Sequence, residues 1–259
     1  MSNEVAYVPY TQIVDRLPIC KGDILYVVSD VLNIAKTCRD NGEKFGCEKF
    51  IESLQEAVGE NGTLMFPTFC WDFCKGIAFD YHKTKGKTGA LGNAALKMSG
   101  FKRTQHPIYS FAAWGRDKGI LIQMDNLSSF GEDSPFAHMR KNRAKALVLG
   151  LSSIRGNSFV HYIEQSMGVE YRYEKEFTTS YVDSAGNVSQ KTYTMYVRHL
   201  DLDVQYVPQP MEQMIDQLGI NKNCKINGAQ YHITDLYGLF EVGALDIQYN
   251  RAKNMYQYL

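Results

Sequence analysis

The chain has 259 residues, 44% of them hydrophobic, and its 28 lysine and arginine residues balance 28 aspartate and glutamate residues. This length suits one domain with embellishments, and the neutral balance argues against nucleic acid or a membrane surface as a partner. No apolar stretch reaches the roughly 18 residues of a membrane helix, and the start of the chain lacks the features of an export signal. We therefore expect a single soluble, cytoplasmic domain over residues 1–259, with six scattered cysteines that form no disulfide framework.

Apolar runs alternate with helical periodicities through the first two thirds of the chain. The pattern predicts strands at 23–29, 63–69, 108–115 and 144–151, and helices at 50–59, 89–100 and 134–141. The last helix begins with a serine cap and a proline in its first position. Such alternation is typical of an α/β sheet.

The pattern changes after Glu174. Residues 174–198 read as two β-rich segments around the turn sequence DSAGN, so we predict a β-hairpin inserted on the sheet. A helix over 211–219 and a second hairpin over 224–233 follow, and a capped helix over 234–250 closes the chain.

The stretch SSIRGNSFVHYIEQSMG (152–168) places His161 three residues before Glu164 on a predicted helix. Imidazole titrates near pH 6.5 in peptides, so it can act as a neutral base, and a carboxylate at this spacing can orient or charge-stabilise it. A histidine hydrogen-bonded locally on a buried helix face fits the same residues equally well.

Three other polar features allow both a functional and a structural interpretation. Asn157 and Ser158 cap the helix, and its free N–H groups suit an anion or oxyanion. Arg103 and Thr104 suit the phosphates of a coenzyme as well as a solvated turn. For His106, a role in fixing the turn before a proline is the preferred interpretation.

Two other classes of site find little support. Cys70, Cys74 and His82 match no established zinc spacing, and no second ligand pair accompanies them, so we expect no metal. The sequence GLSSIRG also lacks the G-x-S-x-G spacing of a hydrolase nucleophile.

Taken in order, several segments resemble the aminoglycoside 3-N-acetyltransferase family, also called antibiotic N-acetyltransferases. The resemblance covers roughly residues 20 to 177, and its order and spacing are more specific than any single motif. The matching segments are Gly22-Asp23, Gly62 to Thr68, Gly89 to Leu91, Arg103 to Gly115, Gly131 to Pro135 and Leu149 to Glu164. Two departures are Val28-Ser29-Asp30, where the family has a histidine and serines, and Asn93, where a glutamate is common.

The resemblance implies an α/β/α sandwich with a central mixed sheet, and acyl transfer from acyl-CoA to a sugar amine without a metal. It places the catalytic histidine at His161, with Glu164 as its carboxylate. The residues expected to contact the donor are Ser29, Thr68, Arg103, Thr104, Ser110 and Ser158. Those expected to contact the acceptor are Asp133, Ser134, Asn157, Tyr162 and Tyr171.

Acceptor choice depends on charge, because aminoglycosides are polycations that favour an acidic cleft. The matched region is rich in basic residues instead: Lys102, Arg103, Arg140, Lys141, Arg143, Lys145, Arg155 and Arg172. We therefore predict a nucleotide-linked (dTDP or UDP) amino sugar from surface-polysaccharide biosynthesis as acceptor. Aminoglycoside acetylation in antibiotic resistance is the alternative, and a non-catalytic CoA- or sugar-binding module is the second alternative. A homo-oligomer is left open.

Overall fold

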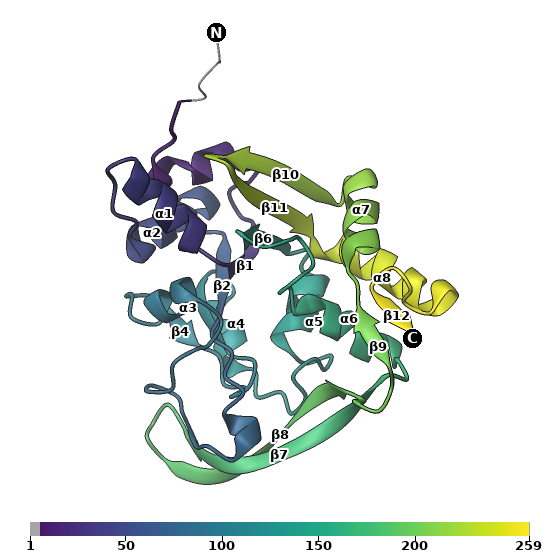
Figure 1. The fold of residues 1–259 in the computed structure, drawn as a ribbon. Helices are drawn as coiled ribbons and strands as arrows, with labels where there is room; N and C mark the ends of the chain where they lie inside the picture. Colours follow the sequence, from purple (N-terminus) through teal and green to yellow (C-terminus); the bar gives the residue numbers. More distant parts are fainter. Residues whose placement is uncertain (1–5, 259) are drawn as a thin grey trace.

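The computed structural model describes residues 6–258 and is built on a central mixed β-sheet. The strands of this sheet are β1 (Ile24–Ser29), β2 (Thr63–Pro67), β4 (Lys102–Arg103), β5 (Phe111–Gly115), β6 (Lys145–Leu149), β10 (Asn221–Ile226) and β11 (Ala229–Asp235). In the described chain they form one seven-stranded sheet in the order β10-β11-β6-β1-β2-β5-β4 (Figure 1). The middle strands β6, β1 and β2 are parallel, whereas β5 and β11 run antiparallel to their neighbours. The predicted mixed sheet is confirmed.

Helices cover both faces of this sheet. They are α1 (Leu32–Asp40), α2 (Cys47–Val58), α3 (Ala90–Ala95), α4 (Lys118–Gln123), α5 (Pro135–Lys141), α6 (Phe159–Met167), α7 (Gln209–Gln217) and α8 (Leu236–Asn250). Short 3₁₀ turns are η1 (Tyr10–Gln12), η2 (Val14–Arg16) and η3 (Phe73–Lys75).

Successive side chains of β1 point to opposite faces of the sheet and pack into two different apolar clusters. Tyr26 and Val28 belong to an apolar cluster that includes side chains of α5, α6 and α8. Leu25 and Val27 point the other way, into a cluster with side chains of α1, α2 and α3. The result is the expected α/β/α sandwich.

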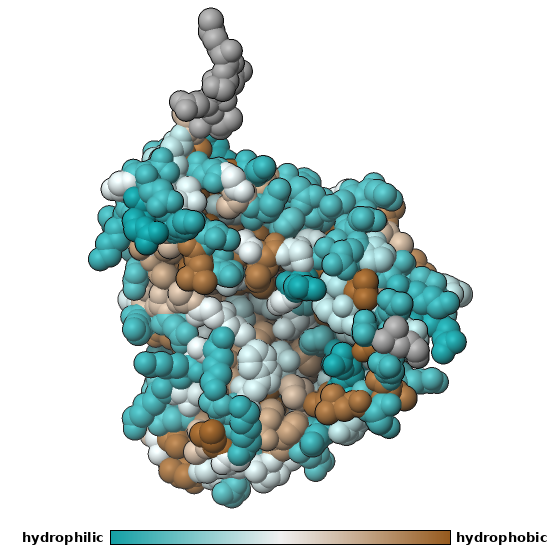
Figure 2. All heavy atoms as spheres, in the orientation of Figure 1, coloured by the Kyte–Doolittle hydropathy of each residue, from teal (hydrophilic) through white to brown (hydrophobic). Residues whose placement is uncertain are grey.

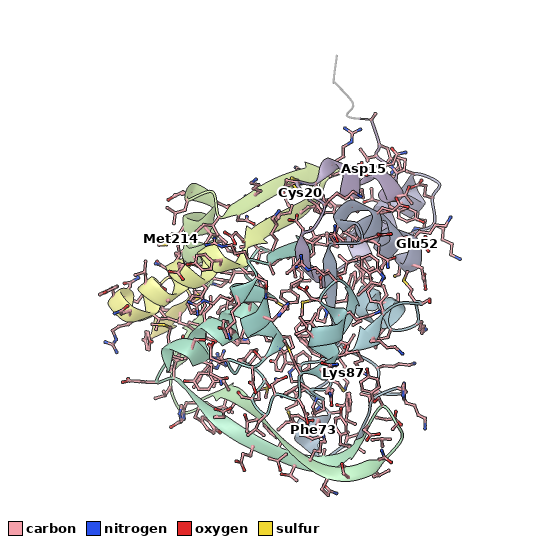
Figure 3. All side chains as sticks on the ribbon, turned by 180° about the vertical axis from the view of Figure 1, so that it is seen from behind. Asp15, Cys20, Glu52, Phe73, Lys87 and Met214 are labelled. Carbon is pink, nitrogen blue, oxygen red and sulfur yellow. The ribbon has the colours of Figure 1, made fainter. Side chains whose placement is uncertain are left out.

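The predicted hairpin insertion is also present. It consists of β7 (Arg172–Val182) and β8 (Val188–Arg198), with β3 (Phe79–Asp80) paired to β7, and it curves below the rest of the protein in Figure 1. In the view from behind, Phe73 lies against this hairpin, and its ring centroid is 5.8 Å from that of Tyr193 (Figure 3). The hairpin is therefore packed onto the protein rather than projecting freely.

Besides the two-residue strands β3 and β4, two three-residue strands were not expected from the sequence. They are β9 (Val204–Tyr206) and β12 (Tyr256–Tyr258), which pair antiparallel beside α6 (Figure 1). Three-residue strands carry too little periodicity to be recognised in isolation. Helices α1 and α4 were missed as well.

The loop 150–158 leaves β6 and leads into α6, and it passes close to the end of β1. Gly150 has φ +68°, and a Cβ atom there would lie 2.2 Å from the carbonyl oxygen of Asp30. Only glycine fits such a close approach with a left-handed backbone. The loop is thus held over the carboxyl ends of the central parallel strands.

None of the helices in residues 6–258 has both the length and the apolar character of a membrane span.

Candidate active site

His161 and Glu164 lie one turn apart on α6 and contact each other directly. The Nδ1 atom of His161 is 2.7 Å from Oε2 of Glu164, whose side chain is fully buried. The imidazole is 27% exposed. The ionised carboxylate accepts only, so Nδ1 carries the hydrogen and Nε2 of the neutral ring has a free lone pair. This is the tautomer that a general base needs.

The surroundings of Glu164 are completed by Tyr171, in the turn before β7, and by Arg172 and Tyr256 from two strands. The Nε atom of Arg172 is 2.8 Å from Oε2, an ion pair whose N–H direction falls outside hydrogen-bond geometry. The Tyr171 hydroxyl donates to Oε1 at 3.1 Å. Arg172 also reaches the Tyr256 hydroxyl at 3.3 Å. The carboxylate is therefore held from both α6 and the strands beside it.

The charges around Glu164 overcome the effect of its burial. Burial alone would raise the pKa of Glu164, but His161 and Arg172 bring it below its usual range. The pKa of Tyr171 is raised by burial and by the neighbouring carboxylate, so its hydroxyl stays a donor. Burial would lower the pKa of Arg172, but Glu164 raises it. The carboxylate is ionised at neutral pH.

A cavity of about 250 Å³ opens beside His161. It is lined by the end of the 150–158 loop, the start of α6, and Arg172, Arg198, Tyr206 and Tyr256. Asn157 is 1% exposed, and its Oδ1 accepts from the Phe159 N–H at 3.2 Å. Its Nδ2 is buried and has no hydrogen-bond partner within residues 6–258. An amide donor without a partner thus lies at the wall of the histidine cavity.

Only one of the two residues predicted to cap α6 does so with its side chain. Asn157 does accept at the helix start, whereas the Ser158 side chain makes no capping hydrogen bond within the described chain. Ser158 lies at the same cavity as His161.

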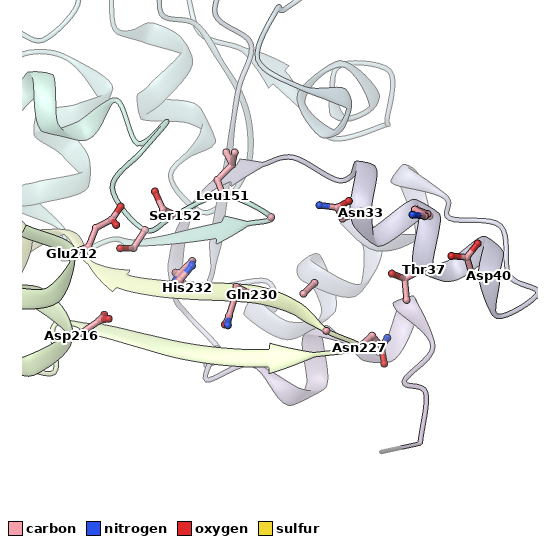
Figure 4. A pocket seen from close by; sticks show the side chains of 15 residues that line it. Asn33, Thr37, Asp40, Leu151, Ser152, Glu212, Asp216, Asn227, Gln230 and His232 are labelled. Carbon is pink, nitrogen blue, oxygen red and sulfur yellow. The ribbon is translucent and has the colours of Figure 1, made fainter. Parts of the chain in front are cut away.

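A larger cavity of about 730 Å³ lies on the other side of the same loop. Figure 4 shows Glu212 and Asp216 of α7 at one end, Asn33, Thr37 and Asp40 of α1 at the other, and Gln230 and His232 of β11 between them. Its charged lining residues are Asp40, Glu212 and Asp216 against Lys36. Negative charge therefore predominates there.

Figure 2 shows one face of the protein, in the orientation of Figure 1. Hydrophobic and weakly polar residues occupy a hollow near its centre, and hydrophilic side chains surround them. Such a surface suits a ligand with both apolar and polar parts.

Most of the residues predicted to contact the donor are used inside the protein. Thr68 and Ser110 hydrogen-bond to each other at 2.9 Å, and Thr104 accepts from the Phe111 N–H. Arg103 is 2% exposed and donates to the carbonyl oxygens of Thr68, Tyr81 and Thr84. Neither cavity described above has any of these four among its lining residues. Ser29 is half-buried beside the Gly89 backbone.

The residues predicted to contact the acceptor are dispersed. Asp133 is exposed, and Ser134 caps α5 by accepting from the Ala137 N–H. Tyr162 is buried and donates to Glu132 at 2.9 Å. Only Tyr171 and Asn157 contribute to the surroundings of His161.

Several basic side chains predicted to attract phosphates have internal partners. Lys145 is 2.7 Å from Asp23, and Arg140 stacks over the Phe240 ring with its guanidinium carbon 3.3 Å from the centroid. Lys141 lies near Glu132 at 3.5 Å. Together with the buried Arg103 and Arg172, they leave fewer free cations than the sequence suggested.

No group of three or more histidine, cysteine, aspartate or glutamate side chains with metal-binding geometry occurs in residues 6–258.

Comparison with known families identifies the class of protein. Residues 30–245 match the family described as aminoglycoside 3-N-acetyltransferase. This match covers most of the chain, so the chain belongs to that family, and the resemblance inferred from the motifs is confirmed. A curated relative is the SPbeta prophage-derived aminoglycoside N(3')-acetyltransferase-like protein YokD of Bacillus subtilis (strain 168), 25% identical over 128 residues. That alignment covers 40% of this chain and 47% of the relative, so the chain spans about half the length of the curated relative it matches.

Solved structures support the same fold. Aminoglycoside acetyltransferase AAC(3)-Xa superposes with a TM-score of 0.76 at 17% identity, covering 92% of this chain and 91% of that one. The binary complex of AAC-IIIb with CoASH gives 0.75 at 16% identity, covering 94% and 98%. The crystal structure of YokD gives 0.76 at 20% identity, covering 96% and 97%.

Proposed function

We propose that this chain is an acyl-CoA-dependent N-acyltransferase that acylates an amino group of an aminoglycoside-type acceptor. The observation that carries the proposal is the His161–Glu164 pair, whose unprotonated Nε2 lies at a cavity in a member of this family. One solved neighbour is a complex with CoASH, and this supports acyl-CoA as the donor.

The proposed reaction uses few groups of the protein. The acceptor amine attacks the thioester carbonyl while Nε2 of His161 takes the amine's proton, forming the C–N bond. The negative charge that develops on the carbonyl oxygen requires a donor, and Nδ2 of Asn157 is the unpartnered amide at this cavity. Collapse breaks the C–S bond, and the proton passes from His161 to the departing thiolate. The products are an amide and free CoA.

The acceptor proposed here is the alternative of the sequence analysis, not its first choice. The basic residues that favoured a nucleotide-linked sugar are largely engaged: Arg103 binds internal carbonyls, and Arg172 pairs with Glu164. The larger cavity presents Asp40, Glu212 and Asp216, which suit a polycation better than a diphosphate. These carboxylates are distant in sequence, so no acidic run revealed them.

A panel assay tests both activity and acceptor. Acetyl-CoA and a longer acyl-CoA are offered with a 2-deoxystreptamine aminoglycoside, a dTDP-amino sugar or a UDP-amino sugar, and free thiol is measured over time. We expect turnover of the aminoglycoside, and a much lower rate with the His161→Ala variant. Turnover of a nucleotide sugar alone would return the acceptor to the first choice. CoA binding by thermal shift, without turnover of any amine, would favour a binding module.

The role of the larger cavity has its own test. Asp40→Asn removes one exposed carboxylate, and we expect a higher KM for the aminoglycoside with an unchanged KM for acetyl-CoA. The matched control is Asp15→Asn, an exposed aspartate that lines neither cavity. Equal effects of the two variants would place the acceptor elsewhere.

A further inference from the structure

A single carboxylate oxygen of Glu164 is contacted by nitrogen atoms of two side chains. Nδ1 of His161 and Nε of Arg172 both contact Oε2, at 2.7 and 2.8 Å. Because both groups contact the same oxygen atom, the imidazole and the guanidinium are close neighbours. Any positive charge on the ring meets the fixed positive charge of Arg172.

Arg172 is held in place independently of α6. It is the first residue of β7, it donates to the Tyr196 carbonyl oxygen of β8 at 3.1 Å, and it reaches the Tyr256 hydroxyl of β12. Its side chain is 11% exposed. The strands around the hairpin base thus fix the guanidinium against the carboxylate.

We propose that Arg172 is a positioning residue, which by sharing Glu164 keeps the carboxylate ionised and keeps His161 a neutral base. The family motif supplies the histidine and the glutamate, whereas this arginine lies outside the H-x-x-E helix. The inference rests on the proposed function only for its kinetic readout.

The electrostatic argument gives a definite direction. Without Arg172, Glu164 would have His161 as its closest cationic partner, and the protonated pair would gain stability. The pair would then release its shared proton at higher pH. The other titratable or charged groups facing the pair are Tyr171 of the turn before β7, Tyr196 and Arg198 of β8, Tyr206 of β9, Tyr256 of β12 and Tyr109 of the loop before β5.

The direct test is an NMR titration of the histidine rings, which needs no catalytic activity. The His161 signal is assigned by its loss in His161→Gln, and the other histidines serve as internal references. In Arg172→Met we expect the His161 midpoint to rise by about one pH unit, the lower end of the effect of a neighbouring charge. In Arg172→Lys, which keeps the cation, we expect a midpoint close to that of the unaltered protein. An unchanged midpoint in a folded Arg172→Met variant would overturn the proposal.

Kinetics provides the second readout. In Arg172→Met the acidic limb of the kcat/KM profile should move to higher pH, and at high pH turnover should recover more fully than at neutral pH. A loss of turnover that is equal at every pH would indicate a purely structural arginine and would overturn the proposal. Absence of turnover in the unaltered protein would refute the proposed function, while the NMR titration would still decide the role of Arg172.

A milder variant covers the case in which Arg172→Met does not fold. Tyr256→Phe removes one partner of the guanidinium and leaves its charge in place. We expect a smaller rise of the His161 midpoint in this variant, with Tyr249→Phe, an exposed tyrosine of α8, as the control. A midpoint equal to that of the control would count against the proposal.

Discussion

The acid–base properties of His161 depend on a carboxylate that water cannot reach. Glu164 is fully buried yet ionised, so it fixes the hydrogen on Nδ1 and leaves Nε2 as acceptor. We expect His161→Ala to lower turnover by roughly 10²–10⁴-fold with the fold intact. Steady-state kinetics measures turnover, and circular dichroism reports whether the fold is intact. The control variant is His199→Ala, just after β8. Nearly normal turnover in a folded variant would exclude the role of general base.

Glu164→Gln tests the carboxylate. A neutral amide still accepts from Nδ1, so turnover should fall less than in His161→Ala. Stability should fall as well, because Arg172 loses its counter-ion in a buried place, at a cost of about 3–5 kcal/mol. Urea unfolding compares it with the unaltered protein. A fully stable variant would show that the ion pair contributes little.

Asn157 brings to the cavity wall an amide donor that has no hydrogen-bond partner within residues 6–258. Asn157→Asp keeps the oxygen that accepts from the Phe159 N–H and removes the Nδ2 donor. If this amide stabilises the oxyanion, turnover should fall by roughly 10²–10³-fold while the KM for acetyl-CoA changes little. The same kinetic assay on Asn157→Ser provides a second variant. A change confined to KM would instead assign Asn157 to binding.

At the scale of single elements, a substitution at Ser134 can distinguish a structural role as helix cap from a role in binding the acceptor. Its side chain caps α5, and this helix packs into the same core cluster as α6. We expect Ser134→Ala to lower the unfolding free energy by about 1 kcal/mol, with KM values unchanged. Asp235→Ala, at the cap of α8, should behave alike. A raised acceptor KM in Ser134→Ala alone would support the contact predicted from the sequence.

Local sequence patterns identified the long elements. The continuous apolar run of β1, which is buried on both faces, and the single apolar face of α2 are local signals, and both elements were found at nearly the predicted positions. The turn at Asn227-Gly228 was recognisable for a local reason too, since both residues have positive φ. By contrast, β9 and β12 exist only through their pairing with each other, and no local pattern marks such a pair.

At the scale of the whole molecule, the same difference between local and long-range contacts explains which residues of the site could be predicted from the sequence. His161 and Glu164 are neighbours on one helix, so spacing alone brought them together. Arg172 and Tyr256 reach Glu164 from separate strands, and the sequence offered Arg172 only as one of many cations. The internal contacts of Arg103 were hidden for a related reason, because the carbonyl oxygens that accept from its guanidinium come from two distant segments.

The buried histidine His106 gives the whole protein a predictable response to acid. Burial lowers the pKa of His106 to about 3, and its Nδ1 accepts from the Ile108 and Tyr109 N–H groups, as expected for a histidine that fixes this turn. An unfolded histidine titrates near 6.5, so below that pH the unfolded chain binds a proton that the folded chain rejects. Stability is therefore complete above about pH 6.5 and falls as the pH decreases, by at most about 1.4 kcal/mol per unit for this group.

Urea unfolding between about pH 7 and 5 isolates this effect, because carboxylates such as Glu164, whose pKa is lowered, lose their stabilising contribution only near or below their unfolded values around 4. We expect His106→Asn, which keeps a side-chain acceptor at the turn but does not titrate, to flatten the slope in this range. His232, whose pKa is also lowered by burial, should account for part of the remaining slope. The control is His199→Asn, which alters a half-buried ring just after β8, and its slope is compared with that of His106→Asn. An unaltered slope in a folded His106→Asn variant would show that protonation of this buried ring does not drive acid unfolding.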